Sequence, residues 1–169
     1  MIKNNLKHKQ QKNTIKKTVL VSENRNSSMV FVIIAFCLPF LLYVQTFKFG
    51  YTHFDDDLLI LNNVSYLSNL ENAIKAFFTD QFIRNITSYY RPIGTLSYMM
   101  DIQLSGGSNA WMYHLSNTLL FGFTSGLLFL FLRRFAIPPK LALLSTLIYF
   151  THPLFVSTVA FIPNRAELL

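Results

Sequence analysis

The densest concentration of reactive side chains in this sequence is a run of three aspartates, Asp55-Asp56-Asp57. The chain of 169 residues holds eight acidic residues against fifteen lysines and arginines, so a run of three adjacent acids is more than its overall composition would lead one to expect. A carboxylate beside an attacking hydroxyl can take its proton as a general base. A pair of carboxylates can instead contribute to a divalent-cation site, although hard cations normally need further oxygen ligands. From the residues alone both interpretations stand, and the choice depends on where the triplet lies relative to a membrane.

Further polar side chains occur near the ends of apolar segments. They are Tyr89-Tyr90-Arg91-Pro92, His114, Asn117, His152, Arg165 and Glu167. Polar groups at membrane depth usually face a cavity or the interior of a helix bundle, so these residues are expected to converge on one side of the protein. Arg91 could equally form a loop salt bridge, to Asp80 or Asp101. His152 could equally be a hydrogen-bonded structural residue beside a helix kink.

Three apolar segments are long enough to position these groups within a bilayer. A hydrocarbon core of about 30 Å takes roughly 20 apolar residues as a helix. The predicted spans are residues 29–47, 111–132 and 141–163. The first contains no charge and is followed by no small-residue cleavage site, so it is predicted to be a retained signal anchor. Pro153 lies inside the third and removes a helical hydrogen bond, which predicts a kinked or unwound backbone beside it.

Basic residues predict the orientation of these spans. The first 28 residues carry seven lysines and arginines against one acid, and residues 133–140 carry three against none. The segment 48–110 has four basic and six acidic residues. The positive-inside rule therefore places the basic tail and the 133–140 turn in the cytoplasm, with residues 48–110 and 164–169 outside it. Topology and attraction to anionic lipid account for the net charge of +7, and no nucleic-acid partner is expected.

The segment 48–110 is predicted to contain two amphipathic helices. The run Ser68-Asn69-Leu70-Glu71 has the spacing of a capping box at the start of the first. An apolar stripe follows at Leu70, Ile74, Phe77 and Phe78. This stripe can pack on protein or lie in the membrane interface. The second helix is predicted to begin with Pro92 and to end at Gly106-Gly107. The predicted fold class is thus an all-α integral membrane protein, with about three transmembrane helices and a large extracytoplasmic first loop.

The order of several short motifs resembles a known family. From about Phe49 to Leu169 the chain reads FDDDLLIL, TDQF, YYRPIGTLSY, YHLSNTLL, HP and NRAELL. This order is similar to the N-terminal part of the GT-C membrane glycosyltransferases, above all the tetratricopeptide-containing transmembrane O-mannosyltransferases and their bacterial relatives. The resemblance implies the N-terminal part of a GT-C fold, whose first outer loop carries an acidic catalytic motif and membrane-parallel helices.

The resemblance also implies an activity. A mannose-like sugar would move from a polyprenyl or dolichyl phosphate to an acceptor hydroxyl, on a protein Ser/Thr or a glycan, at the extracytoplasmic face. The departing phosphate is a stable anion, so acid–base help is needed mainly at the acceptor hydroxyl. Displacement in one step inverts the anomeric centre. No cofactor and no metal are expected, and the membrane would be a bacterial inner membrane, or the ER membrane in a eukaryote.

Site residues follow from the same resemblance. The family's acidic pair maps onto the triplet, which makes Asp55 or Asp56 the expected catalytic base. Arg91 and Arg165 are candidates for binding the donor phosphate through bidentate hydrogen bonds, and His152 for orienting either substrate. The complete set of expected substrate-binding residues is Asp57, Tyr90, Arg91, His152, Arg165 and Glu167.

Two departures from the family and two alternative functions accompany this prediction. Relatives commonly carry an acidic residue where this chain has Ser157, which bears on acceptor choice. The sequence also stops at Leu169, before further expected spans, so it is expected to be a fragment that is inactive alone. The alternatives are a non-catalytic membrane scaffold or assembly subunit, and a fragment of a transporter. An acidic cluster followed by Tyr-Arg-Pro favours the enzyme over the scaffold, and the lack of inverted repeats in the sequence disfavours the transporter.

Overall fold

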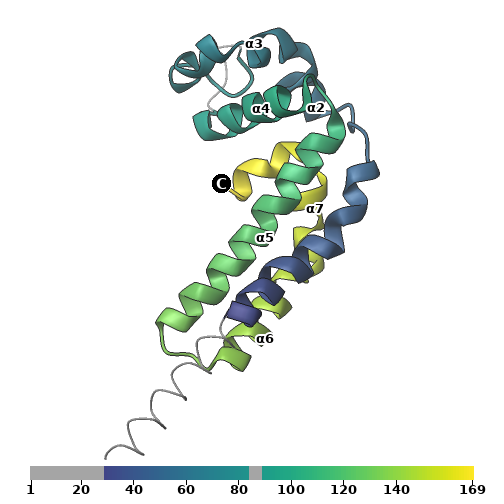
Figure 1. The fold of residues 1–169 in the computed structure, drawn as a ribbon. Helices are drawn as coiled ribbons and strands as arrows, with labels where there is room; N and C mark the ends of the chain where they lie inside the picture. The colour runs from purple at the N-terminus through teal and green to yellow at the C-terminus, as the bar shows by residue number, and fades with distance from the viewer. Residues whose placement is uncertain (1–28, 84–88) are drawn as a thin grey trace, which may run out of the picture.

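The computed structural model describes residues 29–83 and 89–169, and every regular element in those two ranges is helical (Figure 1). Two helices are long and apolar enough to cross a membrane: the first helix, Met29–Lys48, and α5, Ala110–Arg134. A third apolar stretch joins α6 (Pro139–Phe150) to Pro153–Ala160, and its two halves are bent by 53°. The predicted all-α class is therefore confirmed for the described residues, and the third apolar segment is a broken helix.

The break in the third segment lies where Pro153 predicts it. Helix α6 ends at Phe150, the 3-10 helix η5 covers Pro153–Phe155, and α7 covers Val156–Ala160. Proline has no N–H to donate to the preceding turn, so the α-helical ladder cannot continue through it. The His152 side chain fills part of that gap, because its Nδ1 accepts a hydrogen bond from the Leu154 N–H at 3.2 Å.

Small residues bring the first helix and α5 together. A Cβ at Gly122 would lie 3.0 Å from the ring of Phe36 and 3.1 Å from its carbonyl oxygen, so a larger residue here would require the first helix to shift. One turn further along α5, the Ser125 hydroxyl donates to the carbonyl of Ala35 at 2.6 Å. Small residues and hydroxyl-to-backbone bonds are the usual means by which helices associate in lipid. Helix α5 also contacts α6 and α7.

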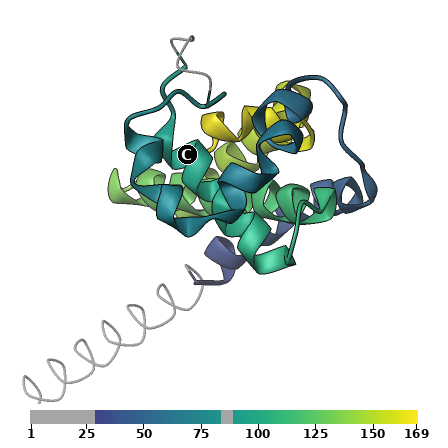
Figure 2. The ribbon, with the colours of Figure 1, turned by 90° about the horizontal axis from the view of Figure 1, so that it is seen from above.

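The described residues between the first helix and α5, 49–83 and 89–109, fold into a cap at one end of the bundle (Figures 1 and 2). Helix α4 lies across α5 rather than along it (Figure 1). It begins with Pro92, and Gly106 ends it in the left-handed conformation at φ 68°, in agreement with the predicted second helix. The helical elements of the cap are α2 (Asp55–Leu59), η2 (Leu61–Asn63), α3 (Val64–Ser68), η3 (Leu70–Ala73), η4 (Lys75–Phe77) and α4 (Pro92–Ser105).

The prediction of one continuous first amphipathic helix is wrong. The residues that carry its apolar stripe form two 3-10 turns, η3 and η4, and Ile74 alone separates them. The expected capping box is also absent from this start: the Asn69 side chain accepts from the Glu71 N–H at 2.9 Å, while the Ser68 hydroxyl donates back to Val64. A short asparagine side chain competes effectively for nearby backbone donors, which shifts the cap by one residue.

A shared hydrophobic core attaches the cap to the bundle. Its buried side chains come from α2, α3, α4, α5 and the 3-10 helix η6 (Ile162–Glu167) that follows α7. They are Leu59, Ile60, Leu67, Tyr98, Met99, Ile102, Tyr113 and Ile162. Because elements from both ends of the sequence contribute to one core, the position of the aspartate run depends on α5 and η6 as well as on its own loop.

Candidate active site in the cap

The three aspartates occupy the first turn of α2 and differ sharply in their surroundings. Asp56 is fully buried, at 0% exposure, and its Oδ2 accepts hydrogen bonds from the Thr52 backbone N–H and hydroxyl, both at 2.6 Å. Its Oδ1 is also buried and has no hydrogen-bond partner among the described residues. Successive helical residues point about 100° apart, so the neighbouring carboxylates face away from this pocket.

Asp55 and Asp57 lie at the surface of the same turn. Asp57 Oδ1 is 3.1 Å from Nδ1 of His53, a pair that is largely solvent-exposed. Asp55 is partly exposed, and its carboxylate makes no hydrogen bond or ion pair to the described residues. Within residues 29–83 and 89–169 there is also no group of three or more His, Cys, Asp or Glu side chains arranged to hold a metal ion. An unpaired, reachable carboxylate at Asp55 is chemically able to accept a proton from a bound hydroxyl.

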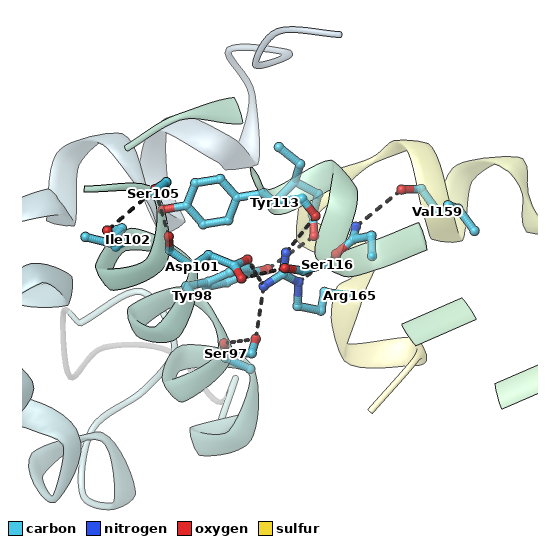
Figure 3. Close-up of polar contacts among 12 residues, drawn as sticks. Ser97, Tyr98, Asp101, Ile102, Ser105, Tyr113, Ser116, Val159 and Arg165 are labelled. Atoms are coloured by element: carbon cyan, nitrogen blue, oxygen red, sulfur yellow. Dashed lines mark hydrogen bonds and ion pairs between the residues drawn. The ribbon is translucent and has the colours of Figure 1, made fainter. Parts of the chain in front are cut away.

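A second polar cluster, which we call the Arg165 cluster, joins α4, α5 and η6 (Figure 3). The guanidinium of Arg165 is fully buried and donates four hydrogen bonds to side chains and backbone of α4 and α5. The acceptors are Asp101 Oδ2 at 2.5 Å, Asn117 Oδ1 at 2.6 Å, the Tyr113 carbonyl at 2.8 Å and the Ser97 hydroxyl at 3.3 Å. The other oxygen of Asp101 accepts from the Ser116 hydroxyl at 2.5 Å.

Two tyrosine rings complete the enclosure of that guanidinium. The carbon Cζ of Arg165 lies 4.8 Å from the ring centre of Tyr98 and 5.6 Å from that of Tyr113. Burial raises the pKa of Tyr98 to about 12, although the nearby guanidinium lowers it in part. Burial likewise raises the pKa of Asp101 above the ordinary carboxyl value, and Arg165 and Ser116 offset only part of that rise. Arg165 is thus the main group that favours the charged form of Asp101 in this buried position.

The structure brings some predicted site residues together and separates others. Element η6, with Arg165 and Glu167, contacts α2 and α4, so it lies at the same end of the bundle as the aspartates. Glu167 accepts a hydrogen bond from the Thr158 hydroxyl at 2.8 Å. His152 is exposed at the break of the third apolar segment, where it caps η5. The predicted phosphate contact of Arg165 remains a prediction, and it would require the pair with Asp101 to open.

Tyr90 and Arg91 lie exposed just before α4. The Tyr90 hydroxyl donates to the carbonyl of Phe77 at 2.9 Å, and the Arg91 guanidinium lies 5.6 Å from the ring centre of Tyr89. Arg91 lines a pocket of ≈ 210 Å³ with residues of α4 and the chain end. That pocket shares Ile93 and Leu169 with an apolar groove of ≈ 450 Å³ between α4 and α5. An accessible cation thus adjoins an apolar groove.

Sequence reasoning missed most members of the Arg165 cluster. It offered Asp101 only as a partner of Arg91, whereas its carboxylate pairs with Arg165. A usable signal was present, because Ser97 and Asp101 are four residues apart and therefore lie on the same face of the predicted second helix. Polar residues in apolar segments usually face the interior of the bundle and pair there with one another or with backbone carbonyls.

The described residues form an all-helical fold with two helices apolar enough to cross a membrane, and its cap carries a buried ion pair and a partly open run of aspartates. No family model and no solved structure matches the chain. Among curated proteins, protein O-mannosyl-transferase TMTC2 of Mus musculus is 27% identical over 146 residues, covering 83% of this chain. TMTC4 of the same species is 32% identical over 133 residues, or 69% of the chain, and Tmtc1 of Drosophila melanogaster is 28% identical over 135 residues, or 78%.

The matched region is a small part of those relatives. The chain spans 17%, 18% and 16% of the length of the three proteins, respectively. Identities of 27–32% over most of this chain indicate a distant relationship to proteins named protein O-mannosyl-transferases. The resemblance that the motif order predicts is therefore confirmed.

Proposed function

We propose that this chain is the N-terminal module of an inverting membrane glycosyltransferase. It acts on a mannose-like sugar carried by a polyprenyl or dolichyl phosphate, and transfers it to an acceptor hydroxyl on the extracytoplasmic side. The observation that carries the proposal is the match to protein O-mannosyl-transferases across a region that includes the aspartates of the cap. In this proposal the bent third segment counts as one span, so three spans carry the cap, with the basic tail in the cytoplasm.

Asp55 is the general base of the proposed reaction. Its partial exposure and its lack of a partner among the described residues support this role, because the base must reach the hydroxyl that it deprotonates. As the acceptor oxygen forms its bond to the anomeric carbon, Asp55 takes the proton and the bond to the phosphate oxygen breaks. Asp56, fully buried against Thr52, positions this turn instead of meeting the acceptor. Asp57 and Tyr90 line the acceptor side.

Arg91 is the stronger candidate for the donor phosphate. Its guanidinium is exposed, whereas that of Arg165 is buried and already bonded. The apolar groove that adjoins the Arg91 pocket offers a place for the hydrocarbon chain of the same donor. This arrangement fits a phosphate that carries a long apolar chain better than it fits a free sugar phosphate. His152 and Glu167 remain proposed substrate contacts from the motif order.

The test is sugar transfer by the intact protein, with every segment that its gene encodes, in lipid nanodiscs. The probes are mannose on polyprenyl phosphate and a Ser/Thr-rich peptide. We expect Asp55→Asn to lower turnover roughly 100-fold or more, because general-base catalysis contributes about 10²–10⁴-fold. Glu71→Gln, an exposed acid of the cap outside the site, is the matched control and keeps wild-type turnover.

Three results contradict the proposal at different points. If Asp55→Asn retains turnover and Asp56→Asn loses it, the base is Asp56. If both single variants and the double variant retain turnover, no carboxylate of this pair acts as the base. If the wild-type protein transfers no sugar from either polyprenyl or dolichyl phosphate, the proposed function is wrong.

A further inference from the structure

His114 occupies a buried position between the bundle and the segment that leads to the aspartates. It lies in the second turn of α5 and is 1% exposed. Its Nε2 is 3.5 Å from the carbonyl oxygen of Gly50, at the long end of the hydrogen-bond range. Its ring also meets the ring of Phe49 edge-on, with the centroids 6.0 Å apart. Both contacts are with the segment that enters α2.

That segment, residues 49–54, has no helix of its own. His53 within it adopts a positive φ of 54°, which few residues with a Cβ adopt without support. Side-chain contacts therefore hold the segment from two sides. His114 meets the Gly50 carbonyl, and the Tyr51 hydroxyl is 2.7 Å from the hydroxyl of Ser108 in the turn before α5.

The same segment holds the buried aspartate. Thr52 uses both its backbone N–H and its hydroxyl to bind Asp56 Oδ2, so any shift of Thr52 moves or releases that carboxylate. Asp55 precedes Asp56 directly in the chain, and its direction follows from where α2 begins. Contacts thus run in one line: His114 to Gly50, two residues along to Thr52, and from Thr52 to Asp56.

We propose that His114 is a positioning residue for the aspartate run, acting through Gly50 and Thr52. The expected effect of His114 on catalysis rests on the proposed function, whereas its effect on the position of the segment rests on geometry alone. A carbonyl accepts, so Nε2 must carry the hydrogen, and Nδ1 is then the bare nitrogen. That nitrogen is buried without a partner among the described residues. The contact that matters is therefore a donor at the position of Nε2.

Three substitutions separate this role from simple packing. In His114→Gln the amide nitrogen extends to the place of Nε2 and keeps the donor. In His114→Asn the amide reaches only as far as Nδ1, and in His114→Leu there is no donor. A ring that merely filled space would be replaced best by leucine, whereas a donor to Gly50 is replaced best by glutamine.

The first measurement is hydrogen exchange of the intact protein in nanodiscs, without substrate. We expect peptides that cover residues 49–56 to exchange at least about 10-fold faster in His114→Asn than in the wild type. His114→Gln restores the wild-type rate, and peptides from α4 are unchanged in both variants. Tyr51→Phe removes the second contact on the same segment, and its exchange is measured instead if His114→Leu does not fold. Equal exchange in the asparagine and wild-type proteins overturns the proposal.

The second measurement is steady-state transfer of mannose from polyprenyl phosphate. We expect kcat to fall roughly 10-fold in His114→Asn with the KM for donor and acceptor unchanged, because misplaced catalytic groups slow the chemical step. His114→Gln recovers most of that loss. Glutamine and asparagine variants with equal kcat overturn the catalytic consequence. If the wild type itself transfers no sugar, the proposed function fails, and the exchange experiment still decides whether His114 positions the segment.

Discussion

Asp101 and Asp56 are buried carboxylates of the cap whose surroundings are opposite. Both oxygens of Asp101 are satisfied, one by the guanidinium of Arg165 and the other by a serine hydroxyl. Asp56 has only neutral donors from Thr52 on one oxygen, and its other oxygen has no partner among the described residues. Satisfied buried networks fix a structure, whereas under-satisfied groups are concentrated at functional sites. The Arg165 cluster is thus the part that fixes the cap, and the aspartate run is the part that remains available for chemistry.

The largest expected loss of stability comes from a substitution that breaks the Arg165 cluster. Arg165→Met leaves the charge of Asp101 buried without its cation, and removal of one partner from a buried pair costs about 3–5 kcal/mol. We expect the free energy of unfolding in mixed micelles to fall by that amount. Arg165→Lys, which keeps the charge and loses the fork of donors, is expected to be intermediate.

The double variant Arg165→Met with Asp101→Leu is the control for that experiment. Because it removes both charges together, it should recover most of the lost stability. A double variant as unstable as Arg165→Met alone would mean that packing around the side chain, and not the unpaired carboxylate, accounts for the loss.

Asn117 should give the next largest effect. Its Oδ1 accepts from Arg165 Nε at 2.6 Å, and its amide donates to the carbonyl of Val159 at 3.3 Å. Asn117→Leu leaves a charged donor and a carbonyl unsatisfied in the core, which we expect to lower the free energy of unfolding by roughly 2–3 kcal/mol. Asn117→Asp keeps the acceptor for Arg165 and should lose less in the same unfolding experiment. An equal loss in the two variants would contradict a role for the hydrogen bond.

The Arg165 cluster and the aspartate run are predictable from the sequence to different extents, and the reason is physical. The apolar segments, the break at Pro153 and helix α4 from Pro92 to Gly106 follow from local rules, since hydropathy, proline and glycine act on their own backbone. The aspartate run was visible because its charges are adjacent. The partner of Arg165 was not visible, because Asp101 lies 64 residues away and no local sequence feature favours it over Asp80. The form of η3 and η4 also escaped prediction, since the Asn69 side chain competes with the helical start.

A substitution of Thr52, which binds the aspartate run, is expected to have a smaller effect on stability. Thr52→Val removes the hydroxyl bond to Asp56 and keeps the shape of the side chain and its backbone N–H bond. Thr52 is exposed, so we expect the free energy of unfolding to fall by only about 1 kcal/mol. Thr52→Ser retains the hydroxyl and should behave as the wild type. A loss as large as that of Asn117→Leu would place Asp56 among the residues that fix the cap.

The smallest expected effect on stability belongs to Asp55. Its carboxylate has no described partner to lose, so Asp55→Asn should change the free energy of unfolding by no more than about 0.5 kcal/mol, as substitutions of unpaired surface groups generally do. The same substitution is expected to remove most of the proposed transfer activity, because an amide cannot accept the proton. Arg165→Met, in contrast, should lose stability and activity together. A stability loss of 2 kcal/mol or more in Asp55→Asn would mean that this carboxylate also fixes the cap, and the separation between the two parts of the cap would no longer hold.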